Sequence, residues 1–151
     1  MNLKNEKLFK QECFINGAWV NSNDNQKIDV NNPSSLEIIG TVPKCGKEET
    51  KIAIEAANSS WDDWKARPAI ERSALLRKWF NLIESNHEDL AQIMTMEQGK
   101  PITESRGEIT YGASFVEWFA EEAKRVYGDI IPDRLTDRRI VVIKQPVGVV
   151  C

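Results

Sequence analysis

A nucleophilic active site needs a serine or cysteine with a general base within hydrogen-bond reach, and the sequence offers one histidine as that base. His87 stands beside two acidic residues at a predicted helix start and is not close in sequence to any of the three cysteines, Cys13, Cys45 and Cys151. A zinc site would need several cysteine or histidine ligands at short spacing, which these scattered residues do not supply. We therefore interpret His87 as a surface residue and predict no nucleophilic site and no metal site.

Carboxylates are plentiful, and a pair such as Glu108 and Glu121 could in principle perform the acid–base chemistry of a glycosidase. Pairs of this kind arise by chance on any solvated helix face, so the pattern favours ordinary surface charge. The isolated glycines form neither a dinucleotide fingerprint nor a P-loop: Gly40, Gly46, Gly99 and Gly107. The residues alone thus indicate no complete catalytic site and no cofactor-binding residues.

Aromatic rings recur at helical spacing in the segment RGEITYGASFVEWFAEEAKRVYGD, residues 106–129. Tyr111, Phe115 and Trp118 fall at i, i+4 and i+7, which places three rings on one face of a helix. Such a stripe usually packs in a hydrophobic core, and the alternative is an apolar wall beside a substrate. The pattern by itself favours core packing.

The overall composition is that of an ordinary soluble protein, with 151 residues, 41% hydrophobic residues, 28% charged residues and a net charge of -3. Nucleic acid and anionic membranes are excluded as natural partners, because both require a clustered basic surface. The odd number of separated cysteines argues against a disulfide framework and for a reducing compartment, and no thiol pair is predicted. The charged amino terminus, MNLKNEKLFKQECF, does not resemble a signal peptide, and no apolar run is long enough for a membrane span. We predict a cytoplasmic protein.

Strand signals begin the chain. Asn16 and Gly17 in FINGAWV can both adopt positive φ between apolar residues, which predicts a tight hairpin. A short apolar strand is expected at residues 36–42, ended by Gly40 and Pro43. The first part of the chain is therefore predicted to be extended and strand-bearing.

Helical spacing follows from Lys47 onward, and a second helix is predicted at residues 69–85. Its core-facing stripe comprises Leu75, Trp79, Leu82 and Ile83. Asn86 is expected to cap a third helix with its side chain. That helix should end at Gly99.

A fourth and longest helix follows Pro101 and should continue to about Tyr127. Beyond it, residues 140–143 predict a terminal strand.

The fold class predicted is α+β, with a mainly helical layer and short strands at both ends. No repeat or flexible linker divides the chain, so residues 1–151 form a single segment. It comprises a strand-bearing arm at residues 1–46, a helical region at 47–127 and the start of further arm strands at 128–151.

Several motifs occur together in one order: FINGAWV, NPSS leading into IGTVP, MEQGKP, GEITYGASFVEWFAEEAKRVYGDIIP and IKQPVGVV. In this order and spacing the sequence resembles the amino-terminal part of an aldehyde dehydrogenase, most closely the succinate-semialdehyde dehydrogenase branch of that superfamily. The resemblance covers nearly the whole chain. It implies that the chain folds as an incomplete amino-terminal portion of the aldehyde dehydrogenase fold.

The resemblance also implies an activity for the parent enzyme, namely NAD(P)-dependent oxidation of succinate semialdehyde to succinate, with glutarate semialdehyde as a related substrate. In the family, the cofactor-binding lysine, the glycine-rich turn, the general-base glutamate and the nucleophilic cysteine follow a segment like KQPVGVV. None of the three cysteines here, Cys13, Cys45 and Cys151, matches that nucleophile. We therefore expect the chain alone to be catalytically inactive and to bind no nicotinamide cofactor tightly.

In the family, the helix that matches Tyr111, Phe115 and Trp118 borders the tunnel by which the aldehyde enters. The resemblance therefore identifies these three residues as candidate substrate-tunnel residues.

Two interpretations of the chain differ in class. The first is a truncated piece of an aldehyde dehydrogenase, and the second is a non-enzymatic binding or assembly module derived from one. Both leave apolar helix faces uncovered, together with the strand RIVVIKQPVGVV, which in the family belongs to an oligomerisation arm. Self-association, or pairing with the missing aldehyde dehydrogenase portions, is expected.

Overall fold

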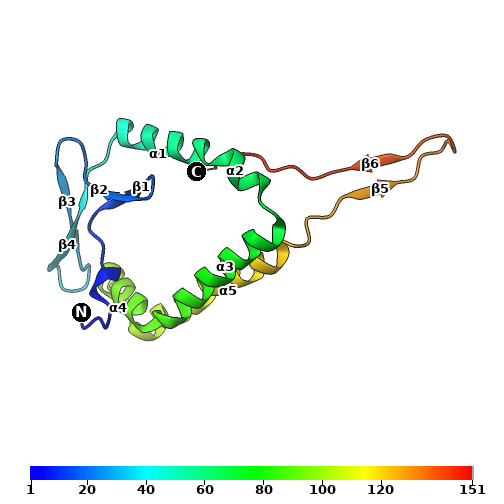
Figure 1. Cartoon of the computed structure of the whole chain (residues 1–151). Helices are drawn as coiled ribbons and strands as arrows, with labels where there is room; N and C mark the ends of the chain where they lie inside the picture. The colour runs from blue at the N-terminus through cyan, green and yellow to red at the C-terminus, as the bar shows by residue number, and fades with distance from the viewer. Residues whose placement is uncertain (151) are drawn as a thin grey trace.

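The structure, a computed structural model, describes residues 1–150 and consists of short antiparallel strand pairs flanking a set of helices (Figure 1). In chain order, the elements are η1 (Glu6–Leu8), β1 (Cys13–Ile15), β2 (Ala18–Val20), β3 (Lys27–Asn31), β4 (Ile38–Pro43), α1 (Lys47–Ser59), α2 (Trp61–Ala66), α3 (Ala69–Ser85), α4 (His87–Gln98), α5 (Ile102–Glu122), β5 (Asp129–Ile131) and β6 (Ile140–Val142). The predicted fold class, a helical layer with strands at both ends, is confirmed. Cys151, one of the thiols considered above, lies outside the described residues.

The first strand pair is the hairpin expected from the Asn-Gly dipeptide. β1 and β2 are antiparallel, with Cys13 opposite Val20. Asn16 has a φ of 50° and Gly17 a φ of 79°, so both central residues are left-handed, as a type I′ turn requires. The predicted hairpin is confirmed. It could be predicted from the sequence because the turn depends only on Asn16 and Gly17 themselves.

The second strand pair, β3 and β4, is also antiparallel and has an irregularity between Val30 and Asn31. Gly40 lies inside β4, opposite Val30, so the prediction that it ends the strand is wrong. A Cβ atom at this position would lie 2.8 Å from the ring of Phe9, and glycine therefore permits that ring to approach the strand closely. Pro43 is the last residue of β4, as expected.

Local stop and start signals set the helix boundaries. α3 begins directly after Pro68 and has the predicted bounds, and α5 begins directly after Pro101. Gly99 ends α4 with a φ of 68°.

Two details of these boundaries differ from the prediction. The side-chain amide of Asn86 donates to the carbonyl oxygen of Leu82 at 2.8 Å, so Asn86 does not cap α4 with its side chain. α5 ends at Glu122 and does not continue to Tyr127, and an extended segment follows it.

The helical layer is built on α5, which lies alongside α3 and also contacts α4 (Figure 1). The buried residues between these helices are small, including Ala91, Ala113 and Ala120. The hydroxyls of Thr95 and Ser105 form a hydrogen bond of 2.8 Å between α4 and α5. Small residues at the contact allow the helix axes to approach closely.

Much apolar surface is left uncovered by this arrangement. The chain exposes 11380 Å², whereas a compact monomer of 17.2 kDa exposes roughly 7,800 Å². Leu75, Trp79 and Leu82 are exposed, so the prediction that these members of the α3 stripe face a core is wrong for the described residues. Ile83, the fourth member, is half-buried. Most of the apolar stripe of α3 therefore has no cover within residues 1–150.

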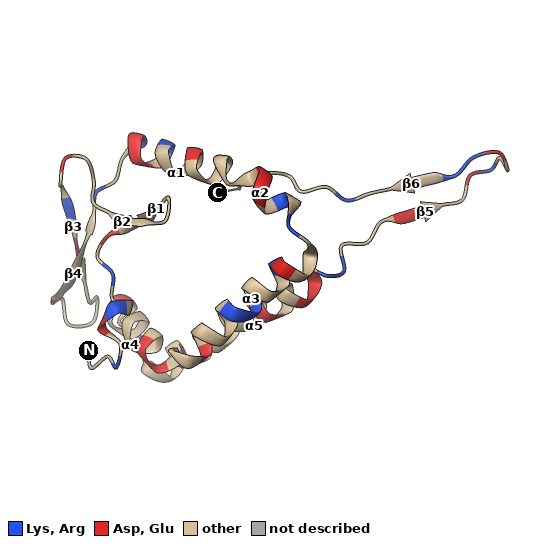
Figure 2. Ribbon diagram, in the orientation of Figure 1, with Lys and Arg blue, Asp and Glu red and all other residues tan. Residues whose placement is uncertain are grey.

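The last two strands form a projecting arm (Figure 1). β5 and β6 are antiparallel, with Ile130 opposite Val141, and both residues are exposed. Figure 2 shows that the charges of this arm gather toward its tip, in the loop between the strands. β6 confirms the predicted terminal strand. Among residues 1–150, no helix has the length and apolar character needed to cross a membrane.

Candidate functional site

The aromatic face of α5 is the site that the sequence singled out, and in the structure it is exposed. Tyr111, Phe115 and Trp118 expose 65%, 47% and 62% of their surfaces. The rings of Tyr111 and Phe115 meet edge to face, with centroids 4.9 Å apart and an interplanar angle of 85°. The interpretation as core packing is therefore wrong within the described residues, and the three rings form an open apolar wall.

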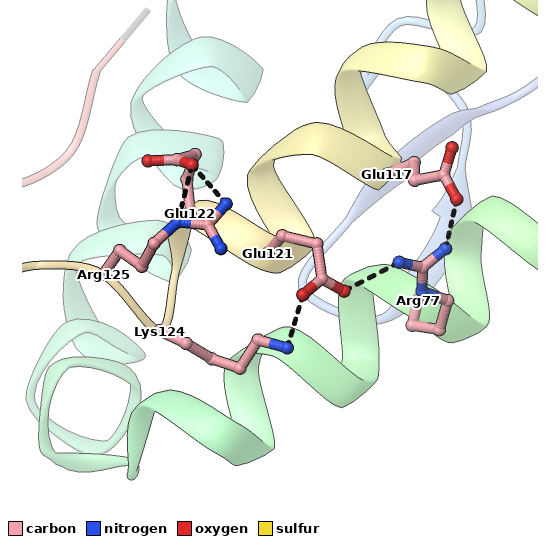
Figure 3. Close-up of polar contacts among 6 residues, drawn as sticks. All are labelled: Arg77, Glu117, Glu121, Glu122, Lys124 and Arg125. Atoms are coloured by element: carbon pink, nitrogen blue, oxygen red, sulfur yellow. Dashed lines mark hydrogen bonds and ion pairs between the residues drawn. The ribbon is translucent and has the colours of Figure 1, made fainter.

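A network of ion pairs lies between α3 and α5 (Figure 3). Its residues Arg77, Glu117 and Glu121 line the same hollow as Phe115 and Trp118. Arg77 of α3 donates from Nη1 to Glu117 Oε1 at 2.5 Å and from Nη2 to Glu121 Oε1 at 2.8 Å. Lys124 donates from Nζ to the other oxygen of Glu121 at 2.6 Å. Arg77 of α3 thus bridges two carboxylates that lie one turn apart on α5.

These contacts keep the network charged. Hydrogen bonds from Lys124 and then from Arg77 lower the pKa of Glu121 below its ordinary value. Hydrogen bonds to Glu117 and then to Glu121 raise the pKa of Arg77. Because the side chains of all these residues remain partly exposed, each pair is screened by water and contributes little to stability. The network therefore links the two helices without contributing much to their stability.

The carboxylate pair considered from the sequence does not form. Glu108 and Glu121 are thirteen residues apart on one helix, which separates them by roughly 20 Å along its axis. Glu108 instead pairs with Lys100. Glu108 and Glu121 therefore cannot act as the acid–base pair of a glycosidase.

Part of the wall and part of the network line an open hollow of about 620 Å³ on the surface of α5. Its rim combines the apolar rings of Phe115, Trp118 and Phe119 with the paired charges of Arg77 and Glu121. A second apolar groove, of about 640 Å³, lies where α3, α4 and α5 meet. Both concave surfaces belong to the helical layer and could receive an apolar side chain or ligand.

The only histidine joins two helices. Nε2 of His87 lies 3.0 Å from the carbonyl oxygen of Arg106 and 3.0 Å from Oγ1 of Thr110, so α4 is tied to α5 at this point. Arg106 donates to both carboxylate oxygens of Glu88, at 2.8 and 2.7 Å. These contacts give His87 a structural role, and none of its hydrogen-bond partners is a thiol.

Two thiols come together that sequence reasoning kept apart. Sγ of Cys45 lies 3.6 Å from Sγ of Cys13, a contact between two free thiols that the sequence did not predict. The residues are thirty-two positions apart, and no spacing signal connects them. The packing of β1 against the start of α1 brings them together.

The described residues do not fit a nicotinamide dinucleotide. A pyrophosphate site of that kind needs a glycine-rich turn that leads from a strand into an open helix N-terminus. Gly17 is in a hairpin turn and Gly99 ends a helix. At the start of α1, Glu49 already accepts from the backbone N–H of Gly46 at 2.8 Å. No step is therefore assigned to such a cofactor within residues 1–150.

The aldehyde dehydrogenase family profile matches residues 19–151. The chain belongs to the aldehyde dehydrogenase family. At 56% identity over 99% of its length, the chain is similar to a glutarate-semialdehyde dehydrogenase of Pseudomonas putida. It is also 52% identical over 99% of its length to an NADP(+) succinate-semialdehyde dehydrogenase of Escherichia coli.

A solved aldehyde dehydrogenase structure has the same arrangement of elements. The succinate-semialdehyde dehydrogenase of Burkholderia pseudomallei superposes with a TM-score of 0.94 at 47% identity, covering 98% of this chain and 31% of that one. The chain likewise spans 31% of the length of the two curated relatives. Its helices and arms therefore correspond to a portion of the aldehyde dehydrogenase fold.

Proposed function

We propose that this chain supplies the helical layer of an NAD(P)-dependent semialdehyde dehydrogenase, which oxidises succinate semialdehyde to succinate. The observation that carries the proposal is the similarity to the E. coli succinate-semialdehyde dehydrogenase, at 52% identity over 99% of the chain. The superposition on the Burkholderia enzyme supports the same assignment.

Glutarate semialdehyde is the second candidate substrate, because the Pseudomonas putida relative carries that name at 56% identity. The two substrates differ by one methylene, and a single methylene in an apolar pocket changes specificity by only about 10- to 200-fold.

The chain by itself is proposed to be inactive. Its one histidine is engaged by Arg106 and Thr110, and its two described thiols, Cys13 and Cys45, contact each other. A nucleophile held against a base is therefore not found among residues 1–150. The nucleophile, the general base and the nicotinamide site of the proposed enzyme belong to further aldehyde dehydrogenase sequence.

Tyr111, Phe115 and Trp118 are proposed to line the path of the substrate. Their rings form an exposed wall next to the hollow on α5. Such a wall excludes water only when other protein covers its exposed side. The exposed apolar stripe of α3 likewise indicates that the helical layer packs against more protein. That cover would be further aldehyde dehydrogenase sequence or a second copy of the chain.

A chimeric enzyme tests the proposed function. In it, this chain replaces the matching 149 residues of the P. putida glutarate-semialdehyde dehydrogenase. We expect the chimera to produce NADH or NADPH with succinate semialdehyde and with glutarate semialdehyde. A chimera that folds and assembles like its parent but oxidises neither aldehyde would contradict the proposal.

The tunnel residues are tested in the same chimera. Replacing Phe115 or Trp118 by alanine should change the KM or kcat ratio between the two semialdehydes, because the wall would no longer shape the acyl chain's path. Phe14→Ala is the matched control, since Phe14 is an equally exposed ring on β1, away from α5. If all three variants show the ratio of the parent chimera, Phe115 and Trp118 do not line the substrate path.

A further inference from the structure

The hairpin and the start of α1 meet at a pair of cysteines. Cys13 is the first residue of β1, and Cys45 lies between the end of β4 and the start of α1. Their sulfur atoms are 3.6 Å apart, and both residues are half-buried. Two thiols at this distance need only a small movement to form a disulfide bond.

Other contacts hold the two segments at this junction independently of the thiols. Glu49 of α1 accepts from the backbone N–H of Asn23, beyond β2, at 2.8 Å and from that of Gly46 at 2.8 Å. A shallow pocket between the hairpin and α1 is lined by Phe14 and Ala53, among other residues. The approach of Cys13 to Cys45 is therefore part of the packing of β1 on α1.

We propose that Cys13 and Cys45 form a reversible disulfide bond when the chain meets a disulfide oxidant such as oxidised glutathione. This site is independent of the dehydrogenase activity proposed above and lies away from the aromatic face of α5.

The reaction is a thiol–disulfide exchange. The thiolate of one cysteine attacks a sulfur of the oxidant and releases one reduced thiol, leaving a mixed disulfide on the protein. The second thiolate then attacks the protein-bound sulfur, which forms the Cys13–Cys45 bond and releases the second reduced thiol. Two protein thiols are oxidised and one small disulfide is reduced to two thiols, so atoms and electrons balance.

The surroundings of Cys45 slow the reaction. Burial, then the hydrogen bond to Cys13, and then the negative charges of Glu49 and Asp24 raise the pKa of the Cys45 thiol. At neutral pH this cysteine is mostly protonated and reacts slowly.

Oxidation would attach the β1–β2 hairpin covalently to the segment that precedes α1. The reduced hairpin is held on α1 by packing and by the contacts of Glu49, whereas the oxidised hairpin is attached covalently. A bond across thirty-two positions restricts the open and unfolded states of this region, so amide exchange in β1 and β2 should become slower.

The test is a redox titration of the full chain carrying Cys151→Ser, with mixtures of reduced and oxidised glutathione. Free thiols are trapped with N-ethylmaleimide. Mass spectrometry then measures the fraction of chains that have lost two hydrogens and carry no N-ethylmaleimide, which are the chains with the disulfide. The effective concentration of one thiol toward the other is expected to be at least roughly tenfold higher in the native chain than in guanidinium chloride. The denatured baseline is necessary because an unfolded chain also closes a short loop readily.

Two further samples complete the experiment. Cys13→Ser with Cys151→Ser should form only the mixed glutathione disulfide, because the partner of Cys45 is missing. Peptide mapping of the unmodified chain should recover the Cys13–Cys45 peptide pair and gives the same readout if Cys151→Ser disturbs folding. An effective concentration no higher than that of the denatured chain, or a native product dominated by mixed disulfides, would overturn the proposal.

Discussion

Asp89 provides a direct test of how the amino-terminal segment is held on the helices. Its side chain is 4% exposed, and its two oxygens accept from the backbone N–H groups of Lys4 at 3.0 Å and Asn5 at 2.8 Å. A hydrogen bond to a charged group contributes about 1.5–3 kcal/mol. Taking the lower value for each of the two bonds, Asp89→Ala should lower the free energy of local opening at Lys4 and Asn5 by about 3 kcal/mol.

Hydrogen-exchange NMR measures this effect residue by residue. A loss of about 3 kcal/mol corresponds to roughly 150-fold faster exchange of the Lys4 and Asn5 amides. Asp89→Asn keeps one acceptor oxygen and should have an intermediate effect. Glu88→Ala is the matched control, because Glu88 is the preceding residue and its carboxylate forms an ion pair with Arg106. If Asp89→Ala and Glu88→Ala give equal exchange at the two amides, the reasoning about Asp89 is refuted.

Three other properties of the chain can be predicted. Hydrogen bonds from the backbone N–H of Asn23 and then of Gly46 lower the pKa of Glu49. The stability that the Glu49 carboxylate contributes is therefore full above the ordinary glutamate pKa of about 4.3, and it is lost as the pH falls through the lower pKa of the folded state. Glu49→Gln should remove this pH dependence from the exchange rate of the Gly46 amide. Arg77→Gln should lower the midpoint of urea unfolding only slightly at low salt and should not change it measurably in molar salt, because the ion pairs of Arg77 are weak and screened. A large decrease that does not depend on salt would contradict this prediction. The exposed apolar faces predict association that increases with concentration, and a single monomeric species in sedimentation velocity at all concentrations would show that these faces need no cover.

The sequence predicted those elements whose signals are local. Asn16 and Gly17 determine a hairpin turn through their own backbone conformations. For the same local reason, Pro68 and Pro101 mark the starts of α3 and α5, and Gly99 marks the end of α4. Features that depend on a distant neighbour were predicted wrongly. The ring of Phe9 explains why a glycine stands inside β4, and no pattern around Gly40 indicates that ring.

The candidate site shows the same division. Helical spacing correctly placed Tyr111, Phe115 and Trp118 on one helix, but it could not tell whether that face is covered, because burial depends on what packs against it. Arg77 was not identified as a partner of α5, since Glu117 and Glu121 lie some forty positions later in the chain. An interhelical ion-pair network can be predicted when two carboxylates at i and i+4 face a basic residue on a neighbouring antiparallel helix. This prediction requires that the pairing of the two helices is already known.

The proposal that the dehydrogenase chemistry lies outside this chain is tested most directly by an activity assay of the purified 151-residue protein. Formation of NADH or NADPH is followed with succinate semialdehyde and glutarate semialdehyde at high protein concentration. The expected result is no aldehyde-dependent reduction by the chain alone, alongside turnover by the chimera under the same conditions. Sustained turnover by the chain that disappears in His87→Ala would contradict the proposal, because it would assign catalysis to a residue interpreted here as structural.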